Sequence, residues 1–261
     1  MSQISIQNVH KIFSSKEREV VALKGIDLEI EKGEFVCLLG PSGCGKSTLL
    51  NAVAGFSLPT TGSIVAEGKA ISAPGPDRGM VFQEYALFPW MTVAQNIAFG
   101  LEIQKKPKDF IDETVAKLLE TLNLKDFANR FPKDLSGGMR QRVAIARVLA
   151  LDSPIMLMDE PFGALDALTR RNLQDELLRI WQASGKTILF VTHSIEESIY
   201  LADRIVVMTY RPGTIKRDQR VDMPRPRDPA APAFNDLKRE LGHLVMEEQQ
   251  RHAADELKLI D

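Results

Sequence analysis

The clearest indication of the fold is the sequence Phe35-Val36-Cys37-Leu38-Leu39-Gly40-Pro41-Ser42-Gly43-Cys44-Gly45-Lys46-Ser47-Thr48. From Gly40 to Ser47 it fits the pattern G-x-x-x-x-G-K-[ST] at every fixed position. The five apolar residues before the pattern indicate a buried strand. A helix with Leu49, Leu50 and Val53 is expected after it, with Gly55 as its C-cap. Strand, glycine-rich turn and helix is the order that a phosphate-binding loop requires.

The chemistry of such a loop rests mainly on its backbone. Successive N–H groups and the positive end of the helix dipole bind a triphosphate, and glycine reaches conformations that a Cβ would forbid. We expect Lys46 to reach the β- and γ-phosphates, Ser47 to place its hydroxyl on Mg²⁺ and Thr48 to support the α-phosphate. The other expected nucleotide contacts are Gly40, Ser42, Gly43, Cys44 and Gly45. The alternative is a glycine-rich turn in which the lysine occurs by chance.

Further short apolar runs predict strands buried on both faces, because they show no alternation. They are 80–82, 155–158, 188–191 and 205–208. Helical spacing lies between them, as in Val115, Leu118, Leu119 and Leu122, and again in Met139, Val143, Ala146 and Ala150. Alternating strands and helices predict an α/β fold with a mostly parallel sheet. The runs 4–9 and 28–30 predict an antiparallel β edge layer.

The sequence predicts a cassette with a helical insertion, followed by a C-terminal segment rich in proline. Residues 93–150 show helical patterns without a convincing buried strand, so we expect a helical subdomain inserted into a core made of 1–92 and 151–220. After residue 220, Pro224, Pro226, Pro229 and Pro232 predict a linker, since proline disfavours helix and central strand. A final helix is expected from about residue 234 to 257, so that 221–261 forms a proline-rich linker and a C-terminal helix.

Two carboxylates follow the predicted strand 155–158. At the carboxyl end of a strand, Asp159 and Glu160 enter the crevice where open α/β sheets bind ligands. Asp159 suits a Mg²⁺ shell, through water. Glu160 is expected to point differently, because adjacent strand residues alternate, and to polarise an attacking water. The alternative is a solvated strand end.

Composition excludes several classes of protein. Lys and Arg total 33 and Asp and Glu 35, a net charge of −2, which gives no basic excess for nucleic acid. The two cysteines, Cys37 and Cys44, make neither a disulfide framework nor a zinc site. The N-terminus lacks the features of a signal peptide, and the longest apolar run, 35–39, is far shorter than the roughly 20 residues of a membrane span. We therefore expect a cytoplasmic protein whose membrane role, if any, depends on a partner.

A second glycine motif reads Leu135-Ser136-Gly137-Gly138-Met139-Arg140-Gln141-Arg142. Ser136 is expected to cap a helix that Gly137 and Gly138 open, which exposes N–H groups for a second anion site. This motif resembles the signature motif of ABC ATPases. The resemblance covers about residues 2 to 220 and implies a P-loop NTPase (RecA-like) core that binds ATP and Mg²⁺.

Other motifs of that family occur in the same order. Gln83 is similar to the Q-loop glutamine, which the resemblance implies contacts the metal and senses a membrane partner. Asp166 matches the D-loop, and His193 matches the switch histidine that contacts the γ-phosphate. Phe13 lies where the family keeps an aromatic that stacks on adenine. The resemblance thus implies Glu160, His193 and Gln83 as catalytic residues and Ser47, Gln83 and Asp159 as metal ligands.

The family resemblance also implies partners. One phosphate loop and one signature motif per chain imply a dimer, with itself or a paralogue, that sandwiches ATP between subunits. The chain shows no sustained heptads, no second cassette and no fused membrane span, so a stand-alone importer cassette with separate permease subunits is expected. Its place would be peripheral, at the cytoplasmic face of the inner membrane, with an extracytoplasmic solute-binding protein as an indirect partner.

Finer similarity points to a subgroup. Residues 82–93 and 158–170, with 211–213, look like the cassettes of nitrate, sulfonate and taurine importers. In that comparison Phe88, Pro89 and Trp90 would line the groove for a permease helix, within the contact region 83–90. A small anion is the expected solute. A thiamine precursor, or a soluble ABC ATPase that acts on macromolecules, stays an alternative.

Overall fold

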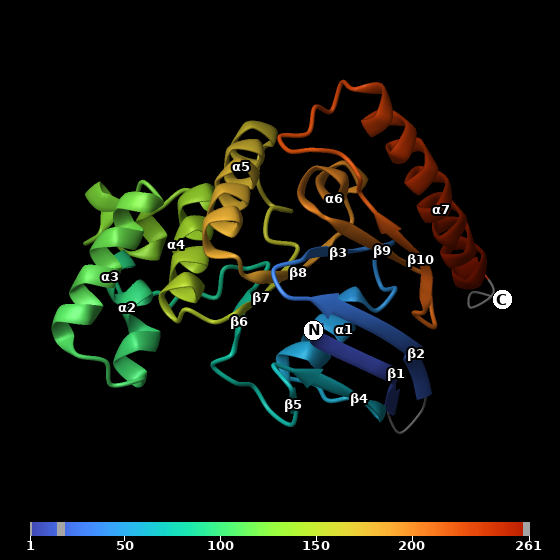
Figure 1. The fold of residues 1–261 in the computed structure, drawn as a ribbon, viewed down its shortest axis with the longest axis horizontal. Helices are drawn as coiled ribbons and strands as arrows, with labels where there is room; N and C mark the ends of the chain where they lie inside the picture. The colour runs from blue at the N-terminus through green and yellow to red at the C-terminus, as the bar shows by residue number, and fades with distance from the viewer. Residues whose placement is uncertain (1, 15–18, 258–261) are drawn as a thin grey trace. The chain divides into compact units, whose positions relative to one another are not determined.

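The computed structural model describes residues 2–14 and 19–257 (Figure 1). The chain divides by its contacts into two compact units. One consists of Met1–Gly75 with Thr187–Asp261, and the other of Pro76–Lys186. The phosphate loop belongs to the first unit and the glycine motif at residue 136 to the second.

The N-terminal part of the first unit is an antiparallel sheet. Its order is β2-β1-β4-β5, formed by β1 (Ser2–Ser14), β2 (Glu19–Glu31), β4 (Thr61–Ala66) and β5 (Lys69–Ala70). Pairs such as Ile6↔Leu28 align the apolar positions of β1 and β2, and these side chains are buried. The predicted antiparallel layer is therefore confirmed, although both long strands extend well beyond the two predicted runs.

The rest of the first unit is built, in its described residues, on three buried parallel strands with an antiparallel strand at their edge. Next to each other lie β10 (Ile215–Arg220), β9 (Arg204–Met208), β3 (Phe35–Leu39) and β8 (Thr187–Thr192). β3 runs parallel to β8 and β9, whereas β10 is antiparallel to β9. All five residues of β3 are buried, which explains the absence of alternation in its sequence. The described residues of this unit also form the helices α1 (Lys46–Ala54), α6 (Ile195–Leu201) and α7 (Pro232–Leu257).

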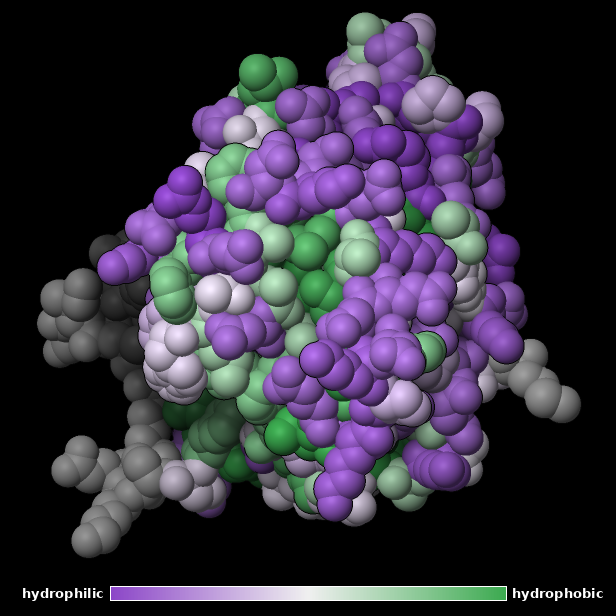
Figure 2. Space-filling model, turned by 90° about the vertical axis from the view of Figure 1, so that its left-hand side faces the viewer, coloured by the Kyte–Doolittle hydropathy of each residue, from purple (hydrophilic) through white to green (hydrophobic). Residues whose placement is uncertain are grey.

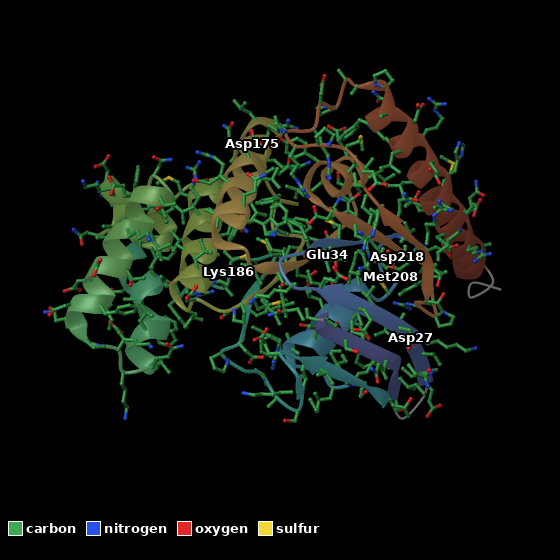
Figure 3. All side chains as sticks on the ribbon, in the orientation of Figure 1. Asp27, Glu34, Asp175, Lys186, Met208 and Asp218 are labelled. Atoms are coloured by element: carbon green, nitrogen blue, oxygen red, sulfur yellow. The ribbon has the colours of Figure 1, made fainter. Side chains whose placement is uncertain are left out.

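Arg204, the first residue of β9, forms a network of ion pairs. The Arg204 guanidinium lies 3.0 Å from Glu34 and 2.7 Å from Asp218, two carboxylates that are labelled in Figure 3. Arg204 also donates to the Glu29 carbonyl oxygen, 2.9 Å away. One side chain thus joins β9 to β10 and to β2.

The second unit combines a parallel strand pair with helices. β6 (Arg78–Val81) lies beside β7 (Ile155–Asp159). The helices are α2 (Val93–Ile103), α3 (Lys108–Thr121), α4 (Gly137–Ala150) and α5 (Ala167–Ser184), with short 3₁₀ turns η1 (Lys125–Phe127) and η2 (Pro132–Asp134). Residues 93–150, all of which the structure describes, form helices and no strand, as the sequence predicts. The boundaries of the predicted subdomain stay a prediction.

A single apolar cluster holds α2, α3 and α4 together. Its buried members include positions that the helical spacing singled out, among them Val115, Leu119, Val143, Ala146 and Ala150. The outer surface of these helices is mixed: Figure 2 faces the side where α2 and α3 lie and shows apolar patches between polar groups. In the part of the chain that is described, no helix has both the length and the apolar character needed to cross a membrane.

The proline-rich segment after residue 220 is fixed to the rest of the first unit by the Arg227 side chain. Arg227 is almost fully buried and donates to the carbonyl oxygens of Ile199 (2.6 Å), Ala202 (2.5 Å) and Val221 (3.2 Å). Burial, and next the neighbouring Arg225, lowers the pKa of Arg227 to about 10, so it is still a cation at neutral pH. The predicted linker is thus a packed segment, and α7 follows it at residue 232, close to the predicted start.

Candidate functional site

The phosphate loop adopts the conformation that its glycines permit. Gly45 has φ +102° at the start of α1, and a Cβ there would lie 2.8 Å from the Leu23 side chain and 3.0 Å from the Ala22 carbonyl oxygen. Both the backbone angle and the close approach of β2 therefore require glycine. Gly45 offers no side chain to cap α1, so the first N–H groups of the helix can serve an anion. α1 ends at Ala54, and Gly55 is its C-cap, as predicted.

Lys46 lies inside this loop. It is 4% exposed, and its Nζ donates to the carbonyl oxygens of Gly40 at 2.8 Å and Pro41 at 2.9 Å. The ammonium thus lies beside the first residues of the loop, and its charge is close to the start of α1. Ser47 and Thr48 follow in the first turn of the helix and are half-buried. Such a loop can hold a phosphate group through backbone donors and one cation.

Cys44 sits in the same loop but is a buried, free thiol. Burial raises its pKa, although the Lys46 ammonium acts in the opposite direction. The side chain is therefore protonated at neutral pH. We therefore expect no thiolate chemistry at Cys44, and its predicted backbone contact with nucleotide stays a prediction.

His193 leaves the sheet at the same edge as the phosphate loop. β3 and β8 are parallel neighbours, and their register pairs Leu39 with Thr192. Gly40 directly follows β3 and His193 directly follows β8, so both residues lie just after paired strand ends. His193 is exposed, and Ser194 caps α6 by accepting from the Glu197 N–H at 3.3 Å. This placement fits the predicted role at a γ-phosphate.

Phe13 lies near the outer end of β1, paired with Val20 of β2. Its side chain is 47% exposed, and Lys11 Nζ is 5.2 Å from the centre of its ring. An aromatic face in this position can stack on a base. Its predicted role in binding adenine stays a prediction.

In the second unit, Gln83 and Glu160 converge. β6 and β7 are parallel, with Val81 opposite Met158, so both chain segments leave the sheet at one edge. A Cβ placed on Gly163 would lie 3.9 Å from Glu160 Oε2 and 4.0 Å from Gln83 Nε2, which places both polar groups beside the same glycine. The two side chains that were predicted to act on the reacting end of the nucleotide therefore share one surface of this unit.

A turn, rather than strand alternation, directs Glu160. β7 ends at Asp159, and Glu160 has φ +42°. Its carbonyl oxygen accepts from the Gly163 N–H at 3.1 Å. The predicted reason for the different direction of the two carboxylates is therefore wrong. A left-handed residue with a Cβ costs on the order of 1–2 kcal/mol, and such strain is typical of functional sites.

The glycine motif at residue 136 opens α4 as predicted. Ser136 is the N-cap, and its hydroxyl accepts from the Met139 N–H at 3.3 Å. A Cβ on Gly138 would lie 2.6 Å from the Thr169 methyl group of α5, so only glycine allows this approach. Ser136 itself is exposed. The helix start thus presents an exposed hydroxyl and the positive end of the α4 dipole, both of which favour an anion.

Asp166 caps the next helix. It accepts from the Thr169 N–H at 3.0 Å at the start of α5. This backbone hydrogen bond is the main cause that lowers the pKa of Asp166, so the residue is a carboxylate at neutral pH. Its predicted nucleotide contact stays a prediction.

The segment after Gln83 is braced from two helices. Arg147 of α4 donates to the carbonyl oxygens of Ala86 at 2.7 Å and Tyr85 at 3.2 Å, and burial lowers its pKa. Asn96 of α2 is fully buried and bonds to both backbone groups of Phe88. Trp90, in contrast, is 69% exposed, with its ring centre 5.8 Å from that of Phe88. A rigid segment thus presents a large aromatic side chain to the outside.

Sequence reasoning missed two arginines that hold these motifs. Arg147 carries no motif of its own, and its partners lie 61 and 62 residues away. Arg211 belongs to a segment that resembles the importer cassettes, but nothing in the sequence indicates that its Nε donates to the Gly43 carbonyl oxygen of the phosphate loop at 3.1 Å. Neither contact requires a particular spacing of residues along the chain, so no sequence pattern could have indicated it.

Comparison with known proteins agrees with this geometry. The family model described as ABC transporter matches residues 23–163. The nitrate import ATP-binding protein NrtD of Synechocystis sp. is 46% identical over 91% of this chain and 89% of its own length. The aliphatic sulfonates import ATP-binding protein SsuB of Bacillus cereus is 44% identical over 91% of this chain and 94% of its own length.

Among solved structures, a dimeric ATP-binding cassette in a post-hydrolysis state, bound to ADP and Pi, superposes with a TM-score of 0.75. It is 33% identical and covers 84% of this chain and 99% of its own length. A family match over more than half of the chain and relatives above 40% identity over most of it leave one assignment: this protein belongs to the ABC transporter family, as one of its ATP-binding cassettes.

Proposed function

We propose that this chain is the ATP-hydrolysing subunit of an ABC importer that couples ATP turnover in a cassette dimer to the uptake of a small solute through separate membrane subunits. The observation that carries the proposal is the buried Lys46 ammonium within the glycine-rich loop at the start of α1. The similarity to import ATP-binding proteins supports the direction of transport.

In this proposal each motif has one task. The loop backbone from Gly40 to Gly45 and Lys46 bind the phosphates, and Phe13 stacks on the adenine. Glu160 orients and polarises the attacking water, and His193 contacts the γ-phosphate. Most of the rate gain in phosphoryl transfer comes from positioning and from neutralising charge, so residues on rigid strand ends suit the task.

The donor chemistry fits magnesium as part of a nucleotide complex. Within the described ranges, no group of three or more His, Cys, Asp or Glu side chains could hold a metal ion by itself. Mg²⁺ prefers oxygen ligands and is often bound by one or two carboxylates together with substrate phosphates. Ser47, Asp159 and Gln83 would supply the protein oxygens. When bound, the ion would neutralise charge that develops on the β- and γ-phosphates.

The dimer follows from the two anion sites. The exposed start of α4, with Ser136, Gly137 and Gly138, would complete the nucleotide site of a second copy or of a paralogue, and Asp166 would support it. The matched solved cassette is dimeric, which supports this arrangement. ATP then favours the closed dimer because its γ-phosphate contacts both subunits, and hydrolysis removes that contact.

The membrane partners would bind the second unit. The braced segment from Gln83 to Trp90 exposes aromatic surface, as a docking groove for a permease helix requires. The cassette would then work peripherally at the cytoplasmic face of the inner membrane, with an extracytoplasmic solute-binding protein that delivers the solute. A nitrate, sulfonate or taurine-like anion is the proposed solute, since the curated relatives import nitrate and aliphatic sulfonates.

The test is Glu160→Gln in the full chain. Loss of the carboxylate should lower ATP turnover by about 100-fold or more, because general-base assistance is worth about 10²–10⁴. ATP should stay bound, and size-exclusion chromatography with Mg-ATP should show a stable dimer. The control is Glu120→Gln on α3, an exposed carboxylate that should change nothing. Normal turnover by Glu160→Gln would remove that residue from its role, and a wild-type chain without Mg-dependent ATPase activity would overturn the proposed function.

A further inference from the structure

The turn between β9 and β10 lies directly on the phosphate loop. Arg211 Nε donates to the Gly43 carbonyl oxygen at 3.1 Å. Two residues on, Gly213 donates its N–H to the Ala22 carbonyl oxygen at 2.9 Å, and a Cβ on Gly213 would clash with the carbonyl oxygen of Cys44. The turn therefore contacts the loop through one side chain and through its own backbone.

The contact at Gly43 bears on what the loop presents to a phosphate. Gly43 has φ +76° and, as a glycine, many accessible conformations, so a hydrogen bond to its carbonyl oxygen restricts the orientations of its peptide group. In a trans peptide the carbonyl oxygen and the next N–H point in opposite directions. When Arg211 holds the Gly43 oxygen on its side, the Cys44 N–H faces the other way, and it lies 3.4 Å from the Pro41 oxygen of the loop.

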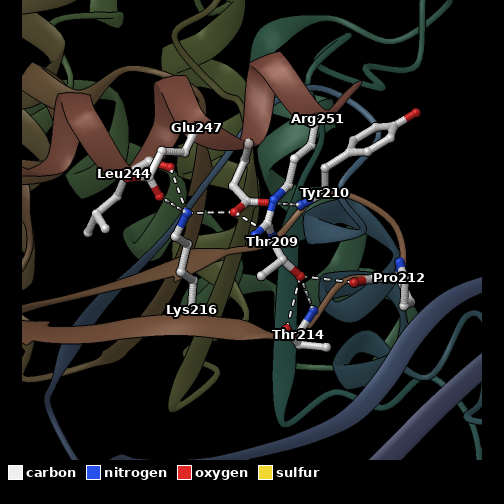
Figure 4. A network of polar contacts seen from close by, with 9 residues as sticks. Thr209, Tyr210, Pro212, Thr214, Lys216, Leu244, Glu247 and Arg251 are labelled. Carbon is white, nitrogen blue, oxygen red and sulfur yellow. Dashed lines mark hydrogen bonds and ion pairs between the residues drawn. The ribbon is translucent and has the colours of Figure 1, made fainter. Parts of the chain in front are cut away.

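The C-terminal helix holds the turn from the other end. Glu248 of α7 is fully buried, and its carboxylate accepts from the Tyr210 N–H at 2.9 Å and from Lys216 Nζ at 2.6 Å (Figure 4). Arg251, one turn later on α7, donates to the same carboxylate at 3.1 Å. Since Tyr210 immediately precedes Arg211, α7 fixes the backbone from which the arginine extends.

The remaining side of the turn is open. It lines a groove of about 670 Å³ together with residues of β1 and β2, among them Asn8, His10 and Lys24. Packing from that side therefore does not determine where Arg211 lies. The position of Arg211 depends on hydrogen bonds within the turn, such as that from Thr209 Oγ1 to the Pro212 oxygen at 2.9 Å. It also depends on the bond from Arg211 to Gly43 and on the bond from Tyr210 to Glu248.

From this chain of contacts we propose that Arg211 is a positioning residue for the phosphate loop, and that Glu248 of the C-terminal helix sets Arg211 through the backbone of Tyr210. The helix after the cassette thereby controls how well the loop is organised for nucleotide. This inference rests on the proposed function, because it concerns the affinity of the same loop for ATP.

The experiment compares four variants of the full-length chain with the wild type. Arg211→Met removes the donor to Gly43, and Arg211→Lys keeps a cation that can still reach the carbonyl. Glu248→Ala removes the acceptor of Tyr210. Glu247→Ala is the matched control, because Glu247 also accepts from Lys216, at 2.7 Å, but makes no hydrogen bond to the turn within the described part of the chain. For each protein, the Kd for Mg-ATP, the KM and kcat of ATP hydrolysis and the Tm are measured.

Arg211→Met and Glu248→Ala should each raise the Kd and KM for ATP by about tenfold, the effect of losing one hydrogen bond. Their kcat should stay within about twofold, because Glu160 and His193 are untouched. Arg211→Lys should recover most of the affinity, and Glu247→Ala should bind ATP like the wild type.

Wild-type affinity in both Arg211→Met and Glu248→Ala overturns the inference, as does an equal loss in Glu247→Ala. A loss of kcat with unchanged KM overturns it too, because it indicates a role other than organising the loop. If Arg211→Met fails to fold, Glu248→Ala against Glu247→Ala decides the question. If the wild-type chain itself neither binds nor hydrolyses ATP, the proposed function fails before this comparison begins.

Discussion

Arg147 Nη1 donates to the Ala86 carbonyl oxygen across 2.7 Å, and this bond fastens the last turn of α4 to the segment that follows Gln83. The first turn of α4 meets the same segment, since a Cβ on Gly137 would lie 3.2 Å from the Tyr85 hydroxyl. The helix that begins at Ser136 is therefore connected at both ends to the segment proposed to contact the permease. We therefore expect the segment after Gln83 and the start of α4 to move together.

Replacing Arg147 should loosen this connection. Arg147→Met removes two hydrogen bonds from a charged donor, so we expect a loss of roughly 1–3 kcal/mol in the free energy of unfolding. Basal ATPase should fall by less than transport. Urea unfolding and ATPase assays with and without the reconstituted permease measure both effects. Arg179→Met, at an exposed position of α5, is the control and should alter neither. Unchanged stability would show that the two bonds contribute nothing.

Trp90 is expected to serve the partner rather than the fold. Trp90→Ala should abolish or strongly reduce transport in the assembled importer and leave basal ATPase of the isolated cassette within about twofold, since large aromatic residues at interfaces carry about 2 kcal/mol or more of binding energy. Ile103→Ala is a matched control, because Ile103 is also 69% exposed in the same unit. Equal transport in both variants would remove Trp90 from the docking groove.

Ser136 combines two roles that substitutions can separate. Ser136→Ala removes the N-cap of α4, and we expect it to cost about 1 kcal/mol of stability. Ser136→Asp restores a capping acceptor but brings a negative charge toward the phosphates. Both variants should lose ATP-dependent dimer formation in the Glu160→Gln background, whereas only Ser136→Ala should unfold at lower urea concentration. A dimer formed normally by Ser136→Asp would contradict the proposed contact with nucleotide.

Glu248 should make stability depend on pH. Burial acts to raise its pKa, but hydrogen bonds from Lys216 and from the Tyr210 N–H, together with the charges of Lys216 and Arg251, outweigh burial and lower it. A carboxyl whose pKa is lower in the folded state stabilises the fold above its ordinary value of about 4.3, and this stabilisation disappears as the pH falls through the folded value. The nearby Glu247 carboxyl also has a lowered pKa, through Lys216.

We therefore expect the difference in unfolding free energy between the wild type and Glu248→Gln to be largest at pH 6–7 and to shrink below about pH 4. Urea unfolding across this pH range measures it. Glu113→Gln, at an exposed position of α3, should run parallel to the wild type. A difference that grows as the pH falls would contradict the assigned direction of the pKa shift.

Features that depend on neighbouring residues could be predicted from the amino-acid order alone. The run 35–39 predicted β3 with its exact ends, since a strand covered on both faces shows continuous apolar residues. Ser136 was recognised as an N-cap and Gly55 as a C-cap because each cap depends on the residues next to it. The motifs around Lys46 and Gln83 also follow from order along the chain.

The distant groups that hold these motifs in place could be identified only in the folded chain. Arg211 and Gly43 are 168 residues apart in sequence, and Arg147 meets Ala86 across 61. The direction of Glu160 comes from a left-handed turn, and a buried Arg227 fixes the proline-rich segment that composition alone marked as a linker. A hydrogen bond from one side chain to a distant carbonyl imposes no period or spacing on the chain, because any backbone oxygen can accept it, so the contact exists only once the fold brings both groups together.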